Sequence, residues 1–318
     1  MTQTRAELVD WAKETIARGS RSFSMASLLL PRQARENAWL LYAWCRTCDD
    51  VTDDQLLGMK PAVDTGQGQG GGDSAASLQP GDIDALTRRA LDSDLPVPPA
   101  YAALRLVQRD AGVPQAAIAQ HLAGFALDRA GWQPQDLPDL ERYCFHVAGA
   151  VGLMMAVIMG VNPDDRDTLG RASDLGLAFQ LNNIARDLVE DAQAGRCYVP
   201  QQWLSEAGLA VEDLAAPAHR AQLAAFARRL HDRALIYDRS ARVGAARLSP
   251  RCRLAILAAA NIYGGIGTAV VQRGPAAWDD RVRTSTPAKL GAITRAAGQS
   301  LTSPQMVSRD GLLDPFAV

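Results

Sequence analysis

The sequence has few of the features that mark several large classes of protein. Its 318 residues include only five cysteines and four histidines, and basic and acidic residues nearly balance, for a net charge of −2. A chain without a basic field cannot hold a nucleic-acid backbone, so we expect no nucleic-acid partner. The odd number of cysteines and a polar stretch 1–10 without an apolar signal region favour reduced thiols and a cytoplasmic location.

Long apolar runs and strand-like patterns are also scarce. The longest apolar run, 147–161, has 15 residues and contains three glycines. A membrane-spanning helix needs roughly 18 or more apolar residues, so we interpret this run as a buried helix. Ala, Leu and Arg dominate and β-branched alternation is rare, which predicts an all-α protein. The expected helices are 5–18, 31–56, 82–91, 101–110, 115–130, 137–159, 166–194, 220–248 and 250–273.

One internal segment has almost no aliphatic residues. Residues 60–81 are rich in Gly, Ser and Gln, a composition that cannot bury enough apolar surface to order itself. The helix before it needs apolar partners from the rest of the chain, so we expect a flexible insertion within a single domain, 1–318. Residues 303–318 are expected to form a loose C-terminal tail.

The first acidic motif is YAWCRTCDDVTDD, residues 42–54. On a helix, Asp49 and Asp53 are four residues apart and share one face, and Asp50 lies on the adjacent stripe. Oxygen ligands without a His or Cys partner suit a hard cation such as Mg²⁺. The alternative is an acidic, solvated helix face.

The second acidic motif is QLNNIARDLVEDAQAGRCY, residues 180–198. Asn183, Asp187 and Asp191 recur every four residues and so line one stripe, and Gly195 is expected to end the helix. A solvent-facing ladder is the alternative, but apolar residues surround this stripe, and a polar line on a buried helix is costly without a ligand. Two such helices in one all-α chain predict a metal-diphosphate site between facing helices.

Diphosphate chemistry explains why both motifs matter. Metal ions between carboxylates stabilise the charge on a departing allylic diphosphate, and the carbocation left behind needs a dry, apolar tunnel. The helix 143–159 is a candidate wall, although such a helix is more often plain core. The stretch GSRSFS at 19–24 offers Ser20, Arg21 and Ser22 as phosphate contacts; its alternative role is a helix cap.

The stretches GSRSFSMASLLLP, YAWCRTCDDVTDD, YCFHVAGAVGLMMAVIMGV, FQLNNIARDLVEDAQAGRCYVPQQWL and AWDDRVRTSTPAKL resemble the squalene/phytoene synthase family. The resemblance implies an isoprenoid synthase fold with a central apolar tunnel. It also implies a Mg²⁺-dependent prenyltransferase, with Mn²⁺ as a substitute, that condenses two geranylgeranyl diphosphates through prephytoene diphosphate to phytoene in carotenoid biosynthesis. A C30 enzyme that uses farnesyl diphosphate is the alternative. No NADPH is expected, because GQGQGGG does not lie between a strand and a helix.

The resemblance also implies roles for individual residues. The implied metal ligands are Asp49, Asp50, Asp53, Asn183, Asp187, Glu190 and Asp191. The implied catalytic residues are Tyr42, Arg46, Asp49, Asp53, Asp187 and Asp191. The implied substrate contacts are Ser20, Arg21, Ser22, Tyr42, Arg46, Tyr143, Val147, Gly152, Gln180, Asn183, Arg186 and Tyr263. Relatives carry a basic residue soon after this last tyrosine, whereas Gly264 and Gly265 follow it here, which leaves one phosphate-binding cation unaccounted for.

A catalytically inactive relative that binds lipid or assembles with other proteins is a hypothesis from another class. Such a protein is expected to lose part of the acidic stripes, and this chain retains both. Because phytoene is insoluble, we expect transient contact with the inner face of a membrane. No strongly basic amphipathic helix identifies the docking surface, and the sequence does not indicate an oligomeric state.

Overall fold

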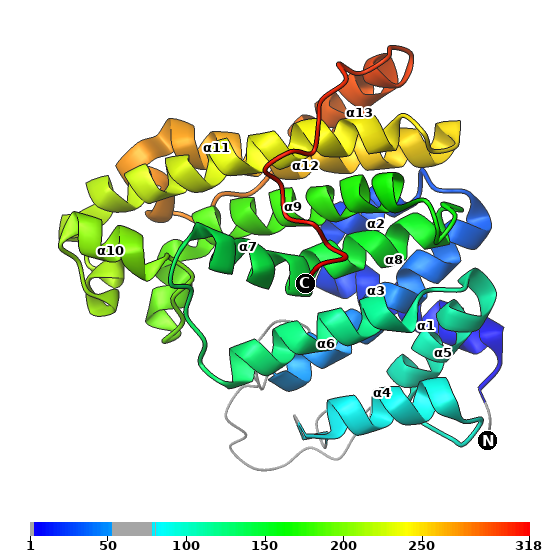
Figure 1. Cartoon of the computed structure of the whole chain (residues 1–318). Coiled ribbons are helices and arrows are strands. Elements are labelled where there is room, and N and C mark those ends of the chain that lie inside the picture. The colour runs from blue at the N-terminus through cyan, green and yellow to red at the C-terminus, as the bar shows by residue number, and fades with distance from the viewer. Residues whose placement is uncertain (1–2, 53–77, 80) are drawn as a thin grey trace. The chain divides into compact units, whose positions relative to one another are not determined.

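The computed structural model describes the whole chain except residues 1–2, 53–77 and 80, and it leaves the side chain of Arg21 undescribed. The described residues contain helices and no strands, as the sequence predicts (Figure 1). They form two compact units, 1–115 and 116–318. Most of the insertion expected at 60–81 lies outside the described residues, and the single domain stays a prediction.

Unit 1 packs around a long central helix. Its elements are α1 (Arg5–Gly19), α2 (Arg21–Ser27), α3 (Arg32–Thr52), α4 (Asp82–Asp92) and α5 (Pro99–Ala111). The helix α3 packs against α1 and α5, and α4 packs against α5. Trp44 and Tyr101 are fully buried between these helices, so the first acidic motif continues from a core helix.

Unit 2 holds the longer helices. Its elements are α6 (Gln115–Arg129), α7 (Leu137–Cys144), a π-helical turn η2 (Phe145–Gly149), α8 (Ala150–Ile158), α9 (Arg166–Gln193), α10 (Gln201–Ala207), α11 (Arg220–Ala245), α12 (Pro250–Arg273) and α13 (Thr286–Ser300). Three short 3₁₀ turns, η3 (Val211–Ala215), η4 (Pro217–His219) and η5 (Gly274–Trp278), connect them. The expected helix 137–159 is therefore one nearly continuous rod interrupted by a π turn, a feature often found near functional sites.

The helix α9 is the axis of unit 2 and packs against α8, α11 and α12. The Asp165 side chain caps its N-terminus by accepting a hydrogen bond from the Thr168 amide at 3.0 Å. Gly195, just beyond its C-terminus, has φ of 76°, a left-handed conformation that glycine adopts without strain. The sequence prediction of this helix end is confirmed, and the second acidic motif occupies the last turns of α9.

Glycines bring α8 and α9 into close contact. A methyl group added at Gly152 would meet the backbone of Ala172, and one added at Gly176 would meet the backbone of Ala148. These glycines therefore let the two backbones approach one another. The close approach places Gly152, which the sequence assigns to the tunnel wall, against a neighbouring helix.

The sequence prediction missed three helices, α2, α10 and α13, all of fifteen residues or fewer. The two seven-residue helices, α2 and α10, are too short for their periodicity to give a clear signal, whereas length does not explain why α13 was missed. The long helices were found within a few residues. The main differences are that the helix expected at 220–248 ends at Ala245, and that residues 53–56 of the helix expected at 31–56 lie outside the described chain.

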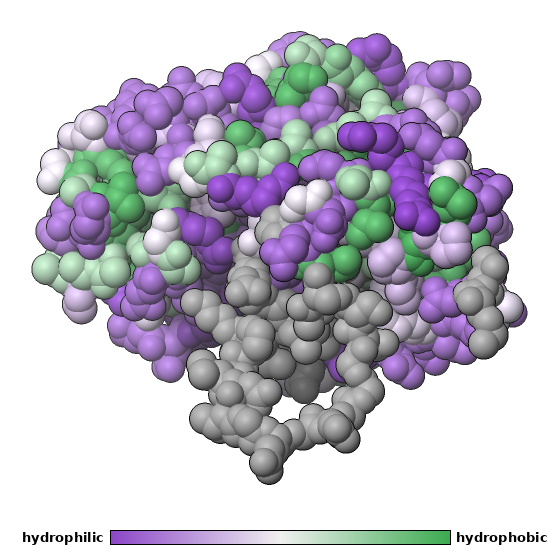
Figure 2. Space-filling model, turned by 90° about the horizontal axis from the view of Figure 1, so that it is seen from below, coloured by the Kyte–Doolittle hydropathy of each residue, from purple (hydrophilic) through white to green (hydrophobic). Residues whose placement is uncertain are grey.

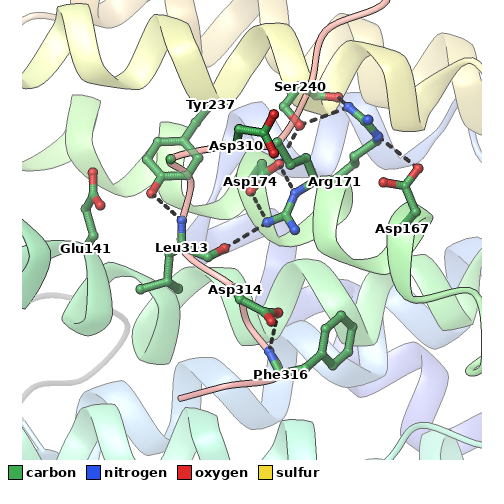
Figure 3. Close-up of polar contacts among 12 residues, drawn as sticks. Glu141, Asp167, Arg171, Asp174, Tyr237, Ser240, Asp310, Leu313, Asp314 and Phe316 are labelled. Atoms are coloured by element: carbon green, nitrogen blue, oxygen red, sulfur yellow. Dashed lines mark hydrogen bonds and ion pairs between the residues drawn. The ribbon is translucent and has the colours of Figure 1, made fainter.

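The C-terminal segment 303–318, expected to be a loose tail, is hydrogen-bonded to helices of unit 2 at several points (Figure 3). The Arg309 guanidinium donates two hydrogen bonds of 2.9 Å to Asp174 on α9. The Tyr237 hydroxyl accepts a hydrogen bond from the Leu313 amide, and Gln120 donates to the carbonyl of Val318. The segment therefore runs back from α13 as a strap across α9 and α11, and this part of the chain is fixed rather than loose.

Two stretches of the described chain, Leu137–Ile158 and Pro250–Trp278, are long and apolar enough to cross a membrane by length and composition alone. In their apolar windows, 67% and 56% of the residues are buried inside the structure. Core helices pass the same test, so these stretches are weak evidence for a membrane span. On the face drawn in Figure 2, hydrophobic residues form separate patches among hydrophilic ones.

Candidate active site

The first acidic motif lies in the last turn of the described part of α3. Asp49 points to solvent, with 56% of its side chain exposed, and lies 3.5 Å from an Arg46 nitrogen. Asp50 is only 7% exposed and accepts a hydrogen bond of 2.5 Å from Arg46. Asp53, the expected partner of Asp49, lies outside the described residues. The described part of the motif therefore contains one solvent-facing carboxylate and one buried carboxylate that is already paired.

The serine-rich stretch lies beside Tyr42 of α3. A methyl group added at Gly19 would meet the Tyr42 hydroxyl, so glycine lets this tyrosine lie against the end of α1. The Ser20 hydroxyl caps α2 by accepting a hydrogen bond of 3.3 Å from the Phe23 amide. Ser22 is half-buried. The capping role that the sequence offered as an alternative is thus present, and a phosphate role for these residues stays a prediction.

The second acidic motif brings carboxylates and guanidinium groups together on α9. Asp187 accepts hydrogen bonds of 2.7 and 2.5 Å from the adjacent Arg186. It also accepts one of 3.0 Å from Arg281, whose other terminal nitrogen lies 3.2 Å from Glu190. Alternating carboxylates and guanidinium groups of this kind can bind both a divalent cation and a diphosphate.

Asp191 is the carboxylate of this stripe that has no cation within hydrogen-bonding distance among the described residues. Its side chain is 16% exposed, and an Arg196 nitrogen lies 3.6 Å from it. Burial raises the pKa of Asp191 to about 7, with repulsion from Asp187 and Glu190 adding to the shift and the charges of Arg196 and Arg186 opposing it. A hard divalent cation would supply the missing positive charge, so the oxygen donors of Asn183, Asp187 and Asp191 fit Mg²⁺. Among the described residues, no three His, Cys, Asp or Glu side chains already form a complete metal cluster.

Arg281 is a residue of this cluster that sequence reasoning did not single out. It lies in the stretch AWDDRVRTSTPAKL, between η5 and α13, far along the chain from Asp187. Its contacts with Asp187 and Glu190 supply a cation to the site although glycines follow Tyr263. The helix α12 continues unbroken through Gly264 and Gly265, and methyl groups added there would meet nothing within 4 Å. The two glycines therefore do not interrupt the helix that carries this tyrosine.

Tyr263 and Gln180 lie near the stripe on different helices. The Tyr263 ring stacks on Phe179 of α9 with 4.5 Å between centroids. Gln180 is half-buried and lies about one turn before Asn183, on the same helix as Arg186. The carboxylate stripe and the stacked aromatic pair thus come from α9 and α12, which pack against one another.

An aromatic stack surrounds a further carboxylate that the sequence did not single out, Asp128 on α6. The hydroxyls of Tyr143 and Tyr198 donate hydrogen bonds to it at 2.9 and 3.0 Å. The Tyr143 ring stacks between Trp132 and Tyr198, with centroid distances of 5.2 and 5.0 Å. Burial raises the pKa of the Tyr143 hydroxyl well above its usual value, so this group remains a proton-bearing donor.

The other expected tunnel residues make contacts between helices. Val147 packs against Gly124 of α6, where an added methyl group would meet its side chain. Gly152 faces α9, as described above. The helix α8 is apolar and mostly buried. A tunnel along this helix stays a prediction.

Comparison with known proteins identifies the class. Residues 16–288 match the family described as squalene/phytoene synthase, and the chain belongs to this family. The chain is 47% identical over 299 residues to a 15-cis-phytoene synthase from Pantoea ananas, covering 93% of both chains. It is 44% identical to a 15-cis-phytoene synthase from Paracoccus sp., covering 91% of this chain and 90% of that one.

Solved structures agree with this class. A dehydrosqualene synthase in complex with a ligand superposes with a TM-score of 0.79 at 26% identity, over 92% of this chain and 96% of that one. The TcSQS structure with the ligand E5700 superposes with a TM-score of 0.69 at 19% identity, over 93% and 89% of the two chains, and supports the fold alone. The protein therefore has the all-α isoprenoid synthase fold and is a prenyltransferase.

Proposed function

We propose that this protein condenses two molecules of geranylgeranyl diphosphate head to head, through prephytoene diphosphate, to phytoene. The observation that carries the proposal is the stripe of Asn183, Asp187 and Asp191 on α9, with Arg186 and Arg281 bonded to its central carboxylate. The relatives of 44 and 47% identity that are named 15-cis-phytoene synthase favour the C40 product over a C30 one.

The proposed cofactor is Mg²⁺, with Mn²⁺ as a substitute. Asn183, Asp187 and Asp191 are the proposed ligands from α9, and Asp49 and Asp53 have the same role in the first motif. When bound, the metal supplies positive charge to the departing diphosphate. Buried Asp191 supports this assignment, because a carboxylate held in a poorly solvated place binds a cation with little competition from water.

The guanidinium groups of Arg186 and Arg281 are the proposed anchors of the diphosphate. Both carry parallel N–H donors that match phosphate oxygens, and both already lie at the carboxylate that faces the metal. Arg186 is 16% exposed, so its charge is only weakly screened. Arg281 is more exposed and comes from a connection between helices, so it can reorient when substrate binds.

The hydrocarbon part of the substrate needs an apolar, water-poor environment, because water would quench the carbocation. The apolar α8 and the ring of Tyr143 are the proposed wall. Asp128 holds the Tyr143 hydroxyl in place, which makes Asp128 a positioning residue in this proposal. No reductant enters the reaction, so no NADPH is required.

We further propose that the protein is cytoplasmic and touches the inner face of a membrane transiently. Phytoene is a C40 hydrocarbon with no polar group, and its transfer into water costs about 0.8 kcal/mol for each CH₂ exposed. A lipid phase is therefore the natural acceptor of the product.

Product analysis tests the proposal. Purified protein is incubated with geranylgeranyl diphosphate or farnesyl diphosphate, with Mg²⁺ or with EDTA, and the extracts are separated by chromatography. We expect phytoene from the C20 substrate only when Mg²⁺ is present. Exclusive turnover of farnesyl diphosphate would instead favour a C30 enzyme, the class of the dehydrosqualene synthase whose fold this chain shares. Inactivity toward both substrates would favour an inactive relative.

A further inference from the structure

An arginine-lined cavity opens on unit 2, between α11, α12 and the beginning of the C-terminal strap. Its volume is about 210 Å³. The polar side chains that line it are Arg239, Arg242, Arg253, Gln299, Thr302 and Gln305. Leu257 and Val307 add an apolar wall. None of these residues belongs to the acidic stripe of α9, and the family match ends at residue 288, before four of them.

The cavity carries an excess of positive charge. Arg242 donates to Asp238 at 2.7 Å, and this is the one ion pair that the three arginines form with the described residues. Arg253 donates to the backbone carbonyls of Gln299 and Thr302, which leaves its charge uncompensated. Within the described residues, Arg239 has neither an ion pair nor a hydrogen bond, and it is exposed. Three guanidinium groups facing one small space repel each other unless an anion lies between them.

Exposed apolar side chains lie on the same segments as the residues that line the cavity, and we call them its apolar rim. Leu301 and Met306 are 88 and 69% exposed, the two most exposed large hydrophobic side chains of the described residues. Each is adjacent in sequence to a residue that lines the cavity. Leu290 on α13, and Leu235 one turn before Arg239 on α11, are exposed as well. Apolar side chains around a cationic pocket are typical of surfaces that bind lipid bilayers.

We propose that this face is the membrane-docking surface, and that the cavity receives the phosphate of an anionic phospholipid headgroup. The guanidinium groups of Arg239, Arg242 and Arg253 match phosphate oxygens, and Leu301 and Met306 enter the region of the acyl chains. The α13 end and the C-terminal segment, orange to red in Figure 1, carry this rim. The inference rests on the membrane contact proposed above and adds the surface and the lipid class.

Vesicle binding of the full chain tests this surface. Wild-type protein is mixed with vesicles of phosphatidylglycerol or phosphatidylcholine at 0.1 M salt, and the bound fraction is measured by flotation. One arginine near an anionic bilayer contributes about fivefold to partitioning. We therefore expect Arg239→Gln to weaken binding to phosphatidylglycerol about fivefold and to leave binding to phosphatidylcholine unchanged. Leu301→Ser with Met306→Ser is expected to weaken binding to both.

Matched controls make the same chemical changes elsewhere. Arg88→Gln removes an exposed arginine of α4, and Leu95→Ser removes an exposed leucine of unit 1. Both are expected to bind vesicles as the wild type does. All variants are expected to make phytoene at the wild-type rate in detergent, since none of these residues lies in the catalytic stripe.

Three outcomes overturn the proposal, and they can be told apart. Unchanged vesicle binding in both cavity variants, or equal losses in the controls, would place the membrane contact on another face. A second outcome is that the wild-type protein does not bind vesicles, but millimolar inorganic diphosphate raises its thermal midpoint and Arg239→Gln abolishes this rise. That outcome would identify a site for a free anion. Absence of all vesicle binding while phytoene forms in detergent would remove the membrane contact and leave the proposed activity intact.

Discussion

Replacement of Arg309 by alanine is expected to destabilise unit 2 strongly and in a pH-dependent way. Its partner Asp174 is 1% exposed and accepts two hydrogen bonds from Arg309 and one of 2.5 Å from the Ser240 hydroxyl (Figure 3). The Arg309→Ala variant leaves a buried carboxylate without the guanidinium that hydrogen-bonds to it, while the charge of Arg171 still favours its ionised form. Breaking a buried pair in this way typically costs about 3–5 kcal/mol. For a unit of this size, such a loss lowers the thermal midpoint by roughly 6–20 °C.

Protonation of Asp174 limits this cost. Burial raises the pKa of Asp174 even with Arg309 and Ser240 opposing the shift, and loss of Arg309 raises this pKa further. A carboxyl whose pKa is higher in the folded than in the unfolded protein binds more protons when folded, so stability falls as pH rises through that folded pKa. Each pH unit in this window changes the free energy of unfolding by up to about 1.4 kcal/mol. The deficit of Arg309→Ala relative to wild type is therefore larger at pH 8 than at pH 5.5.

Thermal unfolding at the two pH values, followed by circular dichroism, is the assay. The double variant Asp174→Asn with Arg309→Gln removes both charges and is expected to recover most of the loss. Arg295→Ala, at an exposed position of α13, is the control and is expected to change the midpoint by little. Equal deficits at both pH values, or no recovery in the double variant, would refute the view that an uncompensated buried charge causes the loss.

Three further predictions concern the site. Asp191→Asn is expected to lower the rate of phytoene formation at least about 100-fold and to raise the Mg²⁺ concentration needed for half-maximal activity. The control Asp232→Asn on α11 is expected to leave both values unchanged, and steady-state assays across Mg²⁺ concentrations measure them. Arg281→Ala is expected to lower kcat/KM for geranylgeranyl diphosphate about 10- to 100-fold, and Arg281→Lys is expected to have an intermediate effect. The control Arg283→Ala is expected to keep the wild-type value, and a wild-type value in Arg281→Ala would exclude a phosphate contact. Tyr198→Phe removes one of the two phenolic donors to Asp128 and is expected to cost about 1 kcal/mol, measured by urea unfolding, and no loss of stability would mean that this hydrogen bond is not formed.

The sequence by itself determined the fold class and the stripe of oxygen-bearing side chains in the second motif. Long stretches of 3.6-residue periodicity fixed the major helices, because a helix of many turns repeats its pattern often enough to be recognised. The spacing of Asn183, Asp187 and Asp191 placed them on one stripe for the same reason, and Gly195 marked the helix end through its backbone freedom. These are local properties, which neighbouring residues set without help from distant ones.

Only the tertiary structure decided which charges meet. Arg281 reaches Asp187 across 94 positions of the sequence, and Arg309 reaches Asp174 across 135. No local pattern encodes such pairs, because they depend on how helices and connections pack. Packing also decides which side chains are buried. Asp49 and Asp50 are adjacent in the sequence but differ in exposure, because the packing of α3 covers one side of the helix and leaves the other open. The sequence therefore predicted the candidate carboxylates, and packing decided which charged groups lie beside them.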